Sequence, residues 1–143
     1  MASVTFNPFT GTLDLVGTGA PGPSTNKGIY NHPGTVAVGD VVYLSAPDTV
    51  DLADANDAGK QPLVGVVASV AGLSCEVMYN GELGGFVGLS PGAVYYLSEV
   101  GTTGNTLTDV APTLPPSIVQ TVGYARSATV LVVMADQNYV ELV

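Results

Sequence analysis

Short apolar segments, rich in Val, Leu and Tyr, follow one another along the chain and are separated by Gly, Pro, Asn and Asp. Segments of this length, bounded by turn-forming residues, are typical of β-strands. The pattern predicts strands at residues 12–17, 35–45, 63–71, 73–79, 84–89, 93–99, 118–126 and 128–136. The one helical candidate, residues 51–57, is too short to form a helix of its own. We therefore expect an all-β fold, either a small β-barrel or a β-sandwich.

The second half of the chain repeats the first half. GDVVYLS at residues 39–45 returns as GAVYYLS at 92–98, and VGVVAS at 64–69 returns as VGYARS at 122–127. The first pair is offset by 53 residues and the second by 58, so the connection between the blocks is five residues longer in the later copy. These offsets predict a duplicated strand-loop-strand unit. What has been copied is a packing pattern, which favours a structural or binding role.

The first part of the chain has a different composition from the rest, because residues 17–23 are dominated by Gly and Pro. We expect an extended N-terminal arm over residues 1–34 and a single β domain over 35–143, with repeat halves at about 35–83 and 84–136. Apolar residues in such an arm need a surface to rest on, and we expect that of a neighbouring subunit. These arm and interface candidates are Phe6, Pro8, Phe9, Leu13, Leu15 and Val16.

Charge is scarce and mostly negative. Apolar residues make up 46% of the chain and charged residues 10%, against roughly 25% charged in an average soluble protein. A surface so poor in charge favours a protein that packs against copies or neighbours, although a small soluble β domain is the alternative. Twelve acids against Lys27, Lys60 and Arg126 give a net charge of −9. Three scattered cations cannot form the basic patch that nucleic acid requires, and they disfavour anionic membranes as partners.

Nothing in the sequence predicts export or insertion into a membrane. No apolar run approaches the roughly 18 residues needed to span a bilayer. Residues 1–6 have neither a basic nor an apolar signal region, so we expect no secretory signal and synthesis in the cytoplasm.

Few side chains offer chemistry. Cys75 is the single cysteine, and its place in the alternating segment 73–79 predicts a small core residue and no internal disulfide. His32 lies in the turn-like sequence YNHPG, which predicts a surface turn. The acid-rich residues 48–59 lack the spacing of an EF-hand, so we expect a solvated acidic loop, with weak calcium binding as the alternative.

Two motif matches fail on physical grounds. GTGAPG at residues 17–22 fits G-x-G-x-x-G, but Pro21 and Pro23 exclude the helix that a dinucleotide site needs. GLSPG at residues 88–92 fits the nucleophile elbow, but Pro91 has no N–H for an oxyanion hole. The acids single out no catalytic pair and the chain has no Trp platform for a sugar. We expect no enzyme activity, no catalytic residue, no metal and no cofactor.

Other segments resemble proteins of bacterial viruses. Residues 88–98 (GLSPGAVYYLS), then 111–113 (APT) and 119–129 (VQTVGYARSAT), resemble a β module recurrent in virion proteins of tailed bacteriophages. Residues 6–15 (FNPFTGTLDL) are similar to short segments of phage tail and fibre proteins. Heads and fibres both use the module, so the resemblance does not distinguish these parts of the virion.

A further resemblance narrows the expectation. GDVV at residues 39–42, together with VGVV at 64–67, is similar to small head-decoration, or cement, proteins. Such proteins bind the outside of an expanded capsid, commonly as trimers, and reach neighbouring subunits with their arms. The resemblance therefore implies a capsid decoration protein on the virion exterior, with the major capsid protein as partner and a homotrimer as its assembly.

Two alternatives stay open. One is a tail-fibre, baseplate or tail-tip subunit, which the same module would serve. The other is a glycan-binding β module, in which the loops at residues 46–62 and 100–117 present polar side chains to a carbohydrate.

Overall fold

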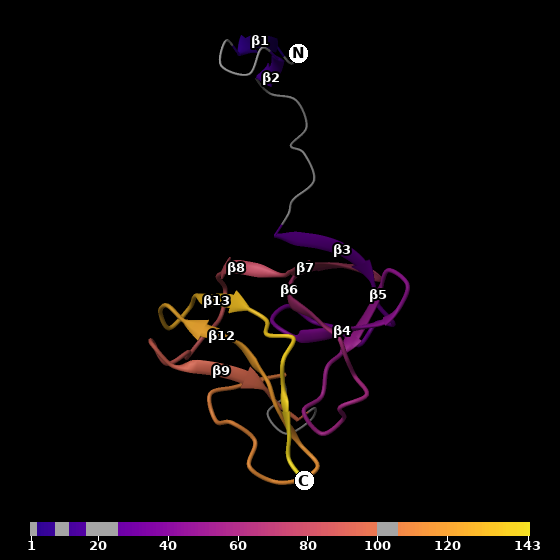
Figure 1. Cartoon of the computed structure of the whole chain (residues 1–143), viewed down its shortest axis with the longest axis vertical. Coiled ribbons are helices and arrows are strands. Elements are labelled where there is room, and N and C mark those ends of the chain that lie inside the picture. Colours follow the sequence, from indigo (N-terminus) through magenta and orange to yellow (C-terminus); the bar gives the residue numbers. More distant parts are fainter. Residues whose placement is uncertain (1–2, 8–11, 17–25, 100–105) are drawn as a thin grey trace.

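The computed structural model describes the backbone of residues 3–7 and 12–16 and the full residues of 26–99 and 106–143. In these residues the regular structure consists of β-strands, which confirms the predicted all-β class (Figure 1). Two of the arm candidates, Pro8 and Phe9, lie outside the described residues.

The first half of the body is a closed five-stranded barrel with strand order β3-β5-β4-β6-β7. Its pairs are antiparallel except where β3 meets β5, with Asn31 opposite Thr49. There the backbone N–H of Asn31 donates to the carbonyl oxygen of Asp48 at 2.8 Å. The strands are β3 (Lys27–Asn31), β4 (Val41–Ala46), β5 (Thr49–Leu52), β6 (Leu63–Ala71) and β7 (Ser74–Met78).

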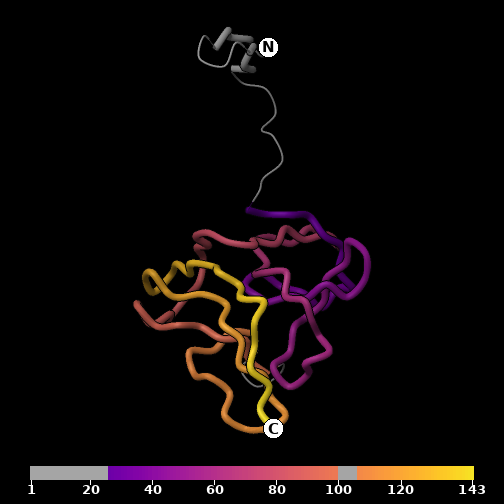
Figure 2. The backbone as a smooth tube through the Cα atoms, in the orientation of Figure 1, coloured from indigo at the N-terminus to yellow at the C-terminus, as the bar shows by residue number. Residues whose placement is uncertain are grey.

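The second half is an antiparallel five-stranded sheet with order β10-β9-β12-β13-β8. The backbone trace runs through the barrel first and enters this sheet afterwards (Figure 2). The strands are β8 (Asn80–Leu83), β9 (Val94–Leu97), β10 (Leu107–Thr108), β12 (Thr121–Ala125) and β13 (Leu131–Met134). A small antiparallel pair, β11 (Ile118–Val119) with β14 (Val140–Glu141), completes the body.

The two halves have the same strand order. Because the barrel is closed, its strands can be read from β3 in the other direction, as β3-β7-β6-β4-β5. The second sheet, read from β8, has the order β8-β13-β12-β9-β10. The two orders agree when each strand of the first half is matched with the strand at the same place in the second half. The barrel differs only in the added pairing of β3 with β5. The duplication seen in the sequence therefore extends over five strands, from residue 27 to 78 and from residue 80 to 134, and each unit begins earlier than expected.

The strand register repeats as well. In the barrel Val42 is opposite Gly65, and the register shifts immediately after this pair. In the sheet Tyr95 is opposite Gly123, and the register shifts at the same place. Such a β-bulge bends the strand locally. The same bulge at the same position in both halves indicates that the repeat extends to individual residue pairs.

Two clusters of buried side chains form the core. One fills the barrel and includes Val42, Val67 and Cys75, which are at most 3% exposed. The other lies between the barrel and the second sheet, and it includes Val66 of the barrel and Leu131 of the sheet. The prediction that Cys75 is a small core residue is confirmed.

Some expectations from the sequence are corrected. Residues 27–31 form barrel strand β3 and do not belong to an arm, although the predicted arm extended to residue 34. Residues 84–89 form a loop in which Gly85 and Gly88 have positive φ, a conformation that suits turns and not strands. The predicted loop 46–62 contains strand β5.

His32 is buried, with 5% exposure, so the prediction of a surface turn was wrong. Its backbone N–H donates to the carbonyl oxygen of Leu73 at 3.0 Å, which ties it to the turn between β6 and β7. Its ring Nδ1 accepts a hydrogen bond from the N–H of Gly34 at 3.0 Å. The turn-like sequence is therefore a turn against the barrel wall.

Residues 3–16 contain a hairpin. Strands β1 (Ser3–Asn7) and β2 (Thr12–Val16) pair antiparallel, with Val4 opposite Leu15 and Phe6 opposite Leu13. The predicted strand at residues 12–17 matches β2, and the strand at 3–7 was not predicted.

Candidate interaction surface

The outer face of the second sheet carries a group of apolar side chains. Because successive residues of a strand point to opposite faces, Tyr95 and Leu97 face the core while Val94 and Tyr96 face outward. Val94 is directly opposite Tyr124 of β12, and each is 42% exposed.

Strand β13 contributes the rest of this group. Val132 is opposite Tyr124, and Met134 follows two residues later on the same side with 57% exposure. Tyr96 and Val132 are half-buried. We call these five residues, Val94, Tyr96, Tyr124, Val132 and Met134, the outer apolar face.

The corresponding positions of the barrel are covered. In the repeat, Val41 corresponds to Val94 and Val66 to Tyr124, because both pairs are directly opposed at the same point of the register. Val41 and Val66 are 0% exposed and belong to the cluster between the barrel and the second sheet. The same position of the repeated unit is thus a packing face in the first half and a solvent-exposed face in the second half.

A groove of about 560 Å³ runs along the outer apolar face. Val94, Tyr124 and Met134 line it, together with Tyr79 and Asn80 from the connection between β7 and β8. The lining of the groove is therefore mixed, because Thr121 and Asp136 add polar groups beside the apolar side chains of the sheet.

Tyr79 is held in place from inside the barrel. Its hydroxyl and that of Tyr30 are 2.6 Å apart and share a hydrogen bond, and the two rings meet edge to face with centroids 6.3 Å apart. Burial, and then the hydrogen bond with Tyr79, raises the pKa of Tyr30 to about 12. The groove thus has a fixed end, because the half-buried Tyr30 orients Tyr79.

The edge of the face is polar. Arg126 Nη1 donates to Glu82 Oε1, and both side chains are more than half exposed. Ion pairs this exposed contribute little to stability. The pair borders the outer apolar face at strand β8, where Glu82 is directly opposite Val132.

A second hollow, of about 270 Å³, lies beside the loop after β10. Ser98, Glu99, Thr108 and Leu114 are among its lining residues. Glu99 Oε1 accepts a hydrogen bond from Ser117 Oγ at 3.0 Å. Part of the loop 100–117, which the glycan alternative uses, borders this hollow, but residues 100–105 lie outside the described residues.

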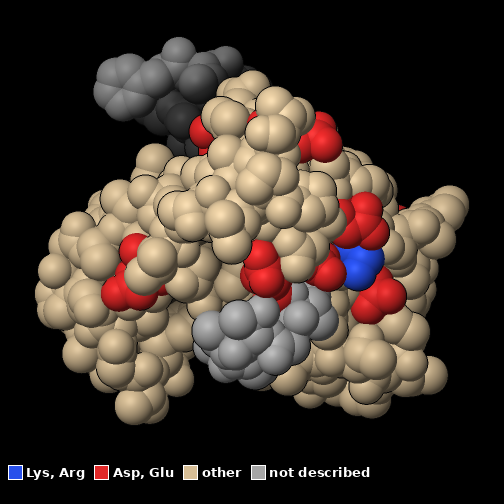
Figure 3. Space-filling view, turned by 90° about the horizontal axis from the view of Figure 1, so that it is seen from below, with Lys and Arg blue, Asp and Glu red and all other residues tan. Residues whose placement is uncertain are grey.

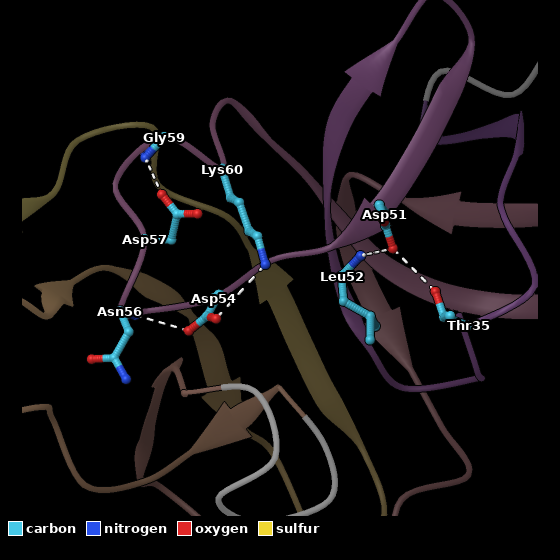
Figure 4. Close-up of polar contacts among 8 residues, drawn as sticks. All are labelled: Thr35, Asp51, Leu52, Asp54, Asn56, Asp57, Gly59 and Lys60. Carbon is cyan, nitrogen blue, oxygen red and sulfur yellow. Dashed lines mark hydrogen bonds and ion pairs between the residues drawn. The ribbon is translucent and has the colours of Figure 1, made fainter.

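The carboxylates of the acidic loop are engaged with their own backbone (Figure 4). Asp54 Oδ1 accepts from the N–H of Asn56, and Asp57 Oδ1 accepts from the N–H of Gly59, each at 2.9 Å. Lys60 Nζ lies 3.7 Å from Asp54. Within the described residues no group of three or more His, Cys, Asp or Glu side chains is placed to hold a metal ion.

Each basic side chain lies beside an acid. Lys27 pairs with Glu76 at 3.3 Å, and Lys60 and Arg126 have the partners given above. Figure 3 shows acidic groups spread over one face of the molecule, with a basic group enclosed by them. In residues 26–99 and 106–143 the three cations are thus dispersed and form no basic patch.

The arm candidates lie on the hairpin where the structure describes them. Phe6 is on β1, while Leu13, Leu15 and Val16 are on β2. Among the described residues, β1 and β2 pair only with each other. Sequence reasoning did not single out the outer apolar face, because the repeat and strand alternation mark Val41 and Val94 alike.

The chain matches no protein-family model, no curated protein and no solved structure. In the part of the chain that the structure describes, no helix is long and apolar enough to cross a membrane. Over the residues that the structure describes, the fold defines the class: an all-β protein built from a tandem five-stranded unit whose second sheet has an exposed apolar face.

Proposed function

We propose that this protein is a structural virion protein, a head-decoration or cement protein that binds the outer surface of a bacteriophage capsid and stabilises it. The observation that carries the proposal is the outer apolar face. Exposed apolar clusters with a polar edge mark interaction sites in soluble proteins. Here the cluster occupies, in the second repeated unit, the same position that the first unit uses to pack against the second unit.

The resemblance to phage proteins supports the same role. The segments that carry it, residues 88–98 and 119–129, contain strands β9 and β12, the two strands that hold Val94 and Tyr124. The part of the chain that resembles virion proteins is therefore also the part that displays the outer apolar face.

The mechanism is mass action. A partner that binds only the assembled shell stabilises that shell by its binding free energy. Many copies on one capsid multiply the effect, and contacts between neighbours add avidity. The partner in this proposal is the major capsid protein, the assembly a homotrimer and the location the capsid exterior. No catalytic residue and no cofactor are needed for this role.

The dispersed charges support binding through uncharged surface. A protein with a net charge of −9 repels its own copies. None of the five side chains of the outer apolar face is charged, although Asp136 lines its groove and Glu82 lies directly opposite Val132, so contact there brings few like charges together. This chemistry fits attachment to other proteins in a dense array.

The first experiment is the copy number of the chain in purified virions, measured by quantitative mass spectrometry against the major capsid protein. A number of the same order as the capsid protein is the expected result. A number far below it would assign the protein to the tail or its fibres, and absence from virions would overturn the virion role.

Capsid binding itself is the second experiment. Capsids lacking the protein are mixed with purified full-length chain, and the temperature at which the shells release DNA is measured with and without it. We expect a higher release temperature and co-sedimentation with shells. A carbohydrate array probed with the same protein tests the glycan alternative.

A further inference from the structure

We propose that strand β8 is a contact between two copies of the chain, in which the β8 strands of both copies pair antiparallel about a two-fold axis. The pairing joins the two second sheets into one continuous sheet. This inference goes beyond the proposed function, because it concerns contact between copies and requires no capsid. It uses main-chain groups at the edge of the sheet and leaves the outer apolar face uncovered.

Strand β8 lies at one edge of the second sheet. It pairs with β13 on one side, and the strand order ends there (Figure 1). Within residues 26–99 and 106–143, no further strand pairs with β8, and no main-chain bond outside the sheet involves Asn80 or Glu82. Both residues are exposed. An edge of this kind is a template for pairing with another chain.

The hydrogen bonds of β13 show which of its main-chain groups face β12. The carbonyl oxygen of Val130 accepts a hydrogen bond from the N–H of Arg126 at 2.9 Å. A Cβ atom on Gly123 of β12 would lie 2.1 Å from the carbonyl oxygen of Val132. The main chain of these even-numbered residues of β13 therefore points to β12.

The same alternation shows which groups of β8 point away from the sheet. In an antiparallel pair, hydrogen-bonded and non-hydrogen-bonded positions alternate, so the main chain of Val133 points to β8. Val133 is opposite Gly81, which therefore bonds to β13. The N–H and C=O groups of Asn80 and Glu82, the residues on either side of Gly81, point to the open edge.

The first repeated unit already uses this edge for pairing. In β3, the counterpart of β8, the N–H of Asn31 donates to the carbonyl oxygen of Asp48, and the pairing of β3 with β5 closes the barrel. In the second unit, β10 is the counterpart of β5 and lies at the opposite edge of the sheet. The edge that closes the first unit thus has no strand beside it in the second, and a second copy supplies one.

The edge of β8 is complementary to itself. When Gly81 of each copy lies at the two-fold axis, Asn80 of one copy is opposite Glu82 of the other, and symmetry repeats the pair. Each pair exchanges two main-chain hydrogen bonds, and the central glycines occupy the close, non-hydrogen-bonded position. Directly opposed Cβ atoms are about 4.5–5.5 Å apart, so the amide of Asn80 can donate to the carboxylate of Glu82.

The charges at this edge are compatible with the contact. Within each copy, Arg126 Nη1 donates to Glu82 Oε1. Across the two-fold axis each Glu82 faces an amide and not a carboxylate. Two chains with a net charge of −9 therefore meet where the acid already has a basic partner.

The contact also orients the outer apolar faces. A two-fold axis between antiparallel strands is perpendicular to their sheet, so both copies present the same face on the same side. The two outer apolar faces then lie side by side and can contact one surface together. The interface is isologous, so it is separate from the three-fold contact of the proposed homotrimer.

Disulfide cross-linking tests the register. Full-length Asn80→Cys and Glu82→Cys proteins are mixed in equal amounts and oxidised. Hydrogen-bonded opposed residues have Cα atoms about 5.5 Å apart, a distance that a disulfide can bridge. Like positions lie diagonally at about 7–8 Å, and the native Cys75 is buried. We expect more cross-linked dimer in the mixture than in either variant alone, and equal amounts would overturn the proposal.

A charge series at Asn80 tests the contact by sedimentation equilibrium. We expect the wild type to self-associate. Asn80→Glu creates two like-charged pairs across the axis and should weaken association by about tenfold. Asn80→Lys faces Glu82 of the other copy and should strengthen association. A wild type that is monomeric at all concentrations would contradict the proposal.

The matched controls are Val110→Glu and Val110→Lys, which change the net charge by the same amounts. Val110 is 69% exposed and follows β10, the strand at the opposite edge of the sheet. Both control variants should associate as the wild type does. If they respond like the Asn80 variants, net charge and not the edge of β8 controls association, and the proposal fails.

A proline tests the main-chain bonds themselves. Asn80→Pro removes an outward N–H, which edge strands tolerate, while Asn80→Thr keeps that N–H. The proline should weaken association by about tenfold or more and the threonine much less; equal effects would count against main-chain pairing. Urea unfolding shows whether each variant is folded, and the charge series carries the test if the proline variant is not. Because no capsid is present, capsid binding is judged by its own experiment.

Discussion

Replacing Gly123 with alanine tests the backbone geometry that the two repeated units share. Gly123 lies on β12 opposite Val133 of β13. A Cβ atom built on it would lie 2.1 Å from the carbonyl oxygen of Val132 and 3.0 Å from the carbonyl carbon. The obstructing atoms are main chain, so no side-chain rotation relieves the contact.

The magnitude follows from the displacement that is required. Ordinary contact distances begin at 3.4 Å, so β12 and β13 would have to separate locally by about 1 Å. Neighbouring strands are held about 4.8 Å apart by their hydrogen bonds. Each ladder bond that is lost costs about 1 kcal/mol, and overpacking adds about 1–3 kcal/mol. We expect Gly123→Ala to lower the free energy of unfolding by at least about 2 kcal/mol.

The repeat extends the prediction to Gly65. Its added Cβ would lie 2.0 Å from the carbonyl oxygen of Met78, which corresponds to Val132 in the second unit. Gly65→Ala should therefore destabilise by a similar amount. Gly84→Ala is the matched control, because an added Cβ there meets nothing within 4 Å, and a surface change of this kind stays within about 0.5 kcal/mol.

Urea unfolding, monitored by circular dichroism, gives the free energy of unfolding of each of the three variants. Tyrosine fluorescence provides a second probe because the chain has no Trp. A Gly123→Ala protein as stable as Gly84→Ala would refute the close approach of β12 and β13. A large effect at Gly123 with none at Gly65 would refute the equivalence of the two units at this position.

Three further predictions concern two buried groups and the half-buried Tyr30. Burial raises the pKa of the Asp40 carboxyl, although the N–H of Ala37 opposes the shift, so the folded state holds that proton more tightly than the unfolded chain does. The free energy of unfolding should therefore fall as pH rises just above the ordinary aspartate range, and Asp40→Asn should reduce that fall in urea titrations at several pH values. Burial also raises the pKa of the Cys75 thiol, so a disulfide reagent should modify it only at the rate of unfolding, and rapid labelling of native protein would contradict this placement. Tyr30→Phe removes the hydrogen bond to Tyr79 and should cost about 1 kcal/mol, while ultraviolet titration of the wild type should show one tyrosine that ionises near pH 12.

Much of the strand pattern was predictable from the sequence. The run predicted at residues 63–71 coincides with β6, and the runs at 73–79 and 93–99 contain β7 and β9. These strands are central in their sheets, so their apolar residues are numerous and regularly spaced.

The missed strands have a common reason. Strand β3 reads KGIYN and β8 reads NGEL, and both lie beside only one strong neighbour, β7 or β13. Their place is determined by long-range pairing with that neighbour and not by their own composition. The loop at residues 84–89 was mistaken for a strand because its apolar residues resemble one, while the positive φ of Gly85 and Gly88 bends the chain away.

Only part of the candidate interaction surface could be predicted from the sequence. The apolar residues of the N-terminal segment stand out in the sequence, and the arm that they predict stays a prediction. The outer apolar face was not visible, because Val41 and Val94 occupy the same place in the same repeated pattern and differ only in what lies over them.

By itself the sequence determined an all-β chain and a duplication, since strand periodicity and repeated turns are local properties. The tertiary structure alone decided that one unit closes into a barrel through the pairing of β3 with β5. It also decided which of two equivalent faces is covered. Both outcomes depend on contacts between segments far apart in the chain. A local sequence pattern does not encode which of two similar sheet faces such a contact will cover.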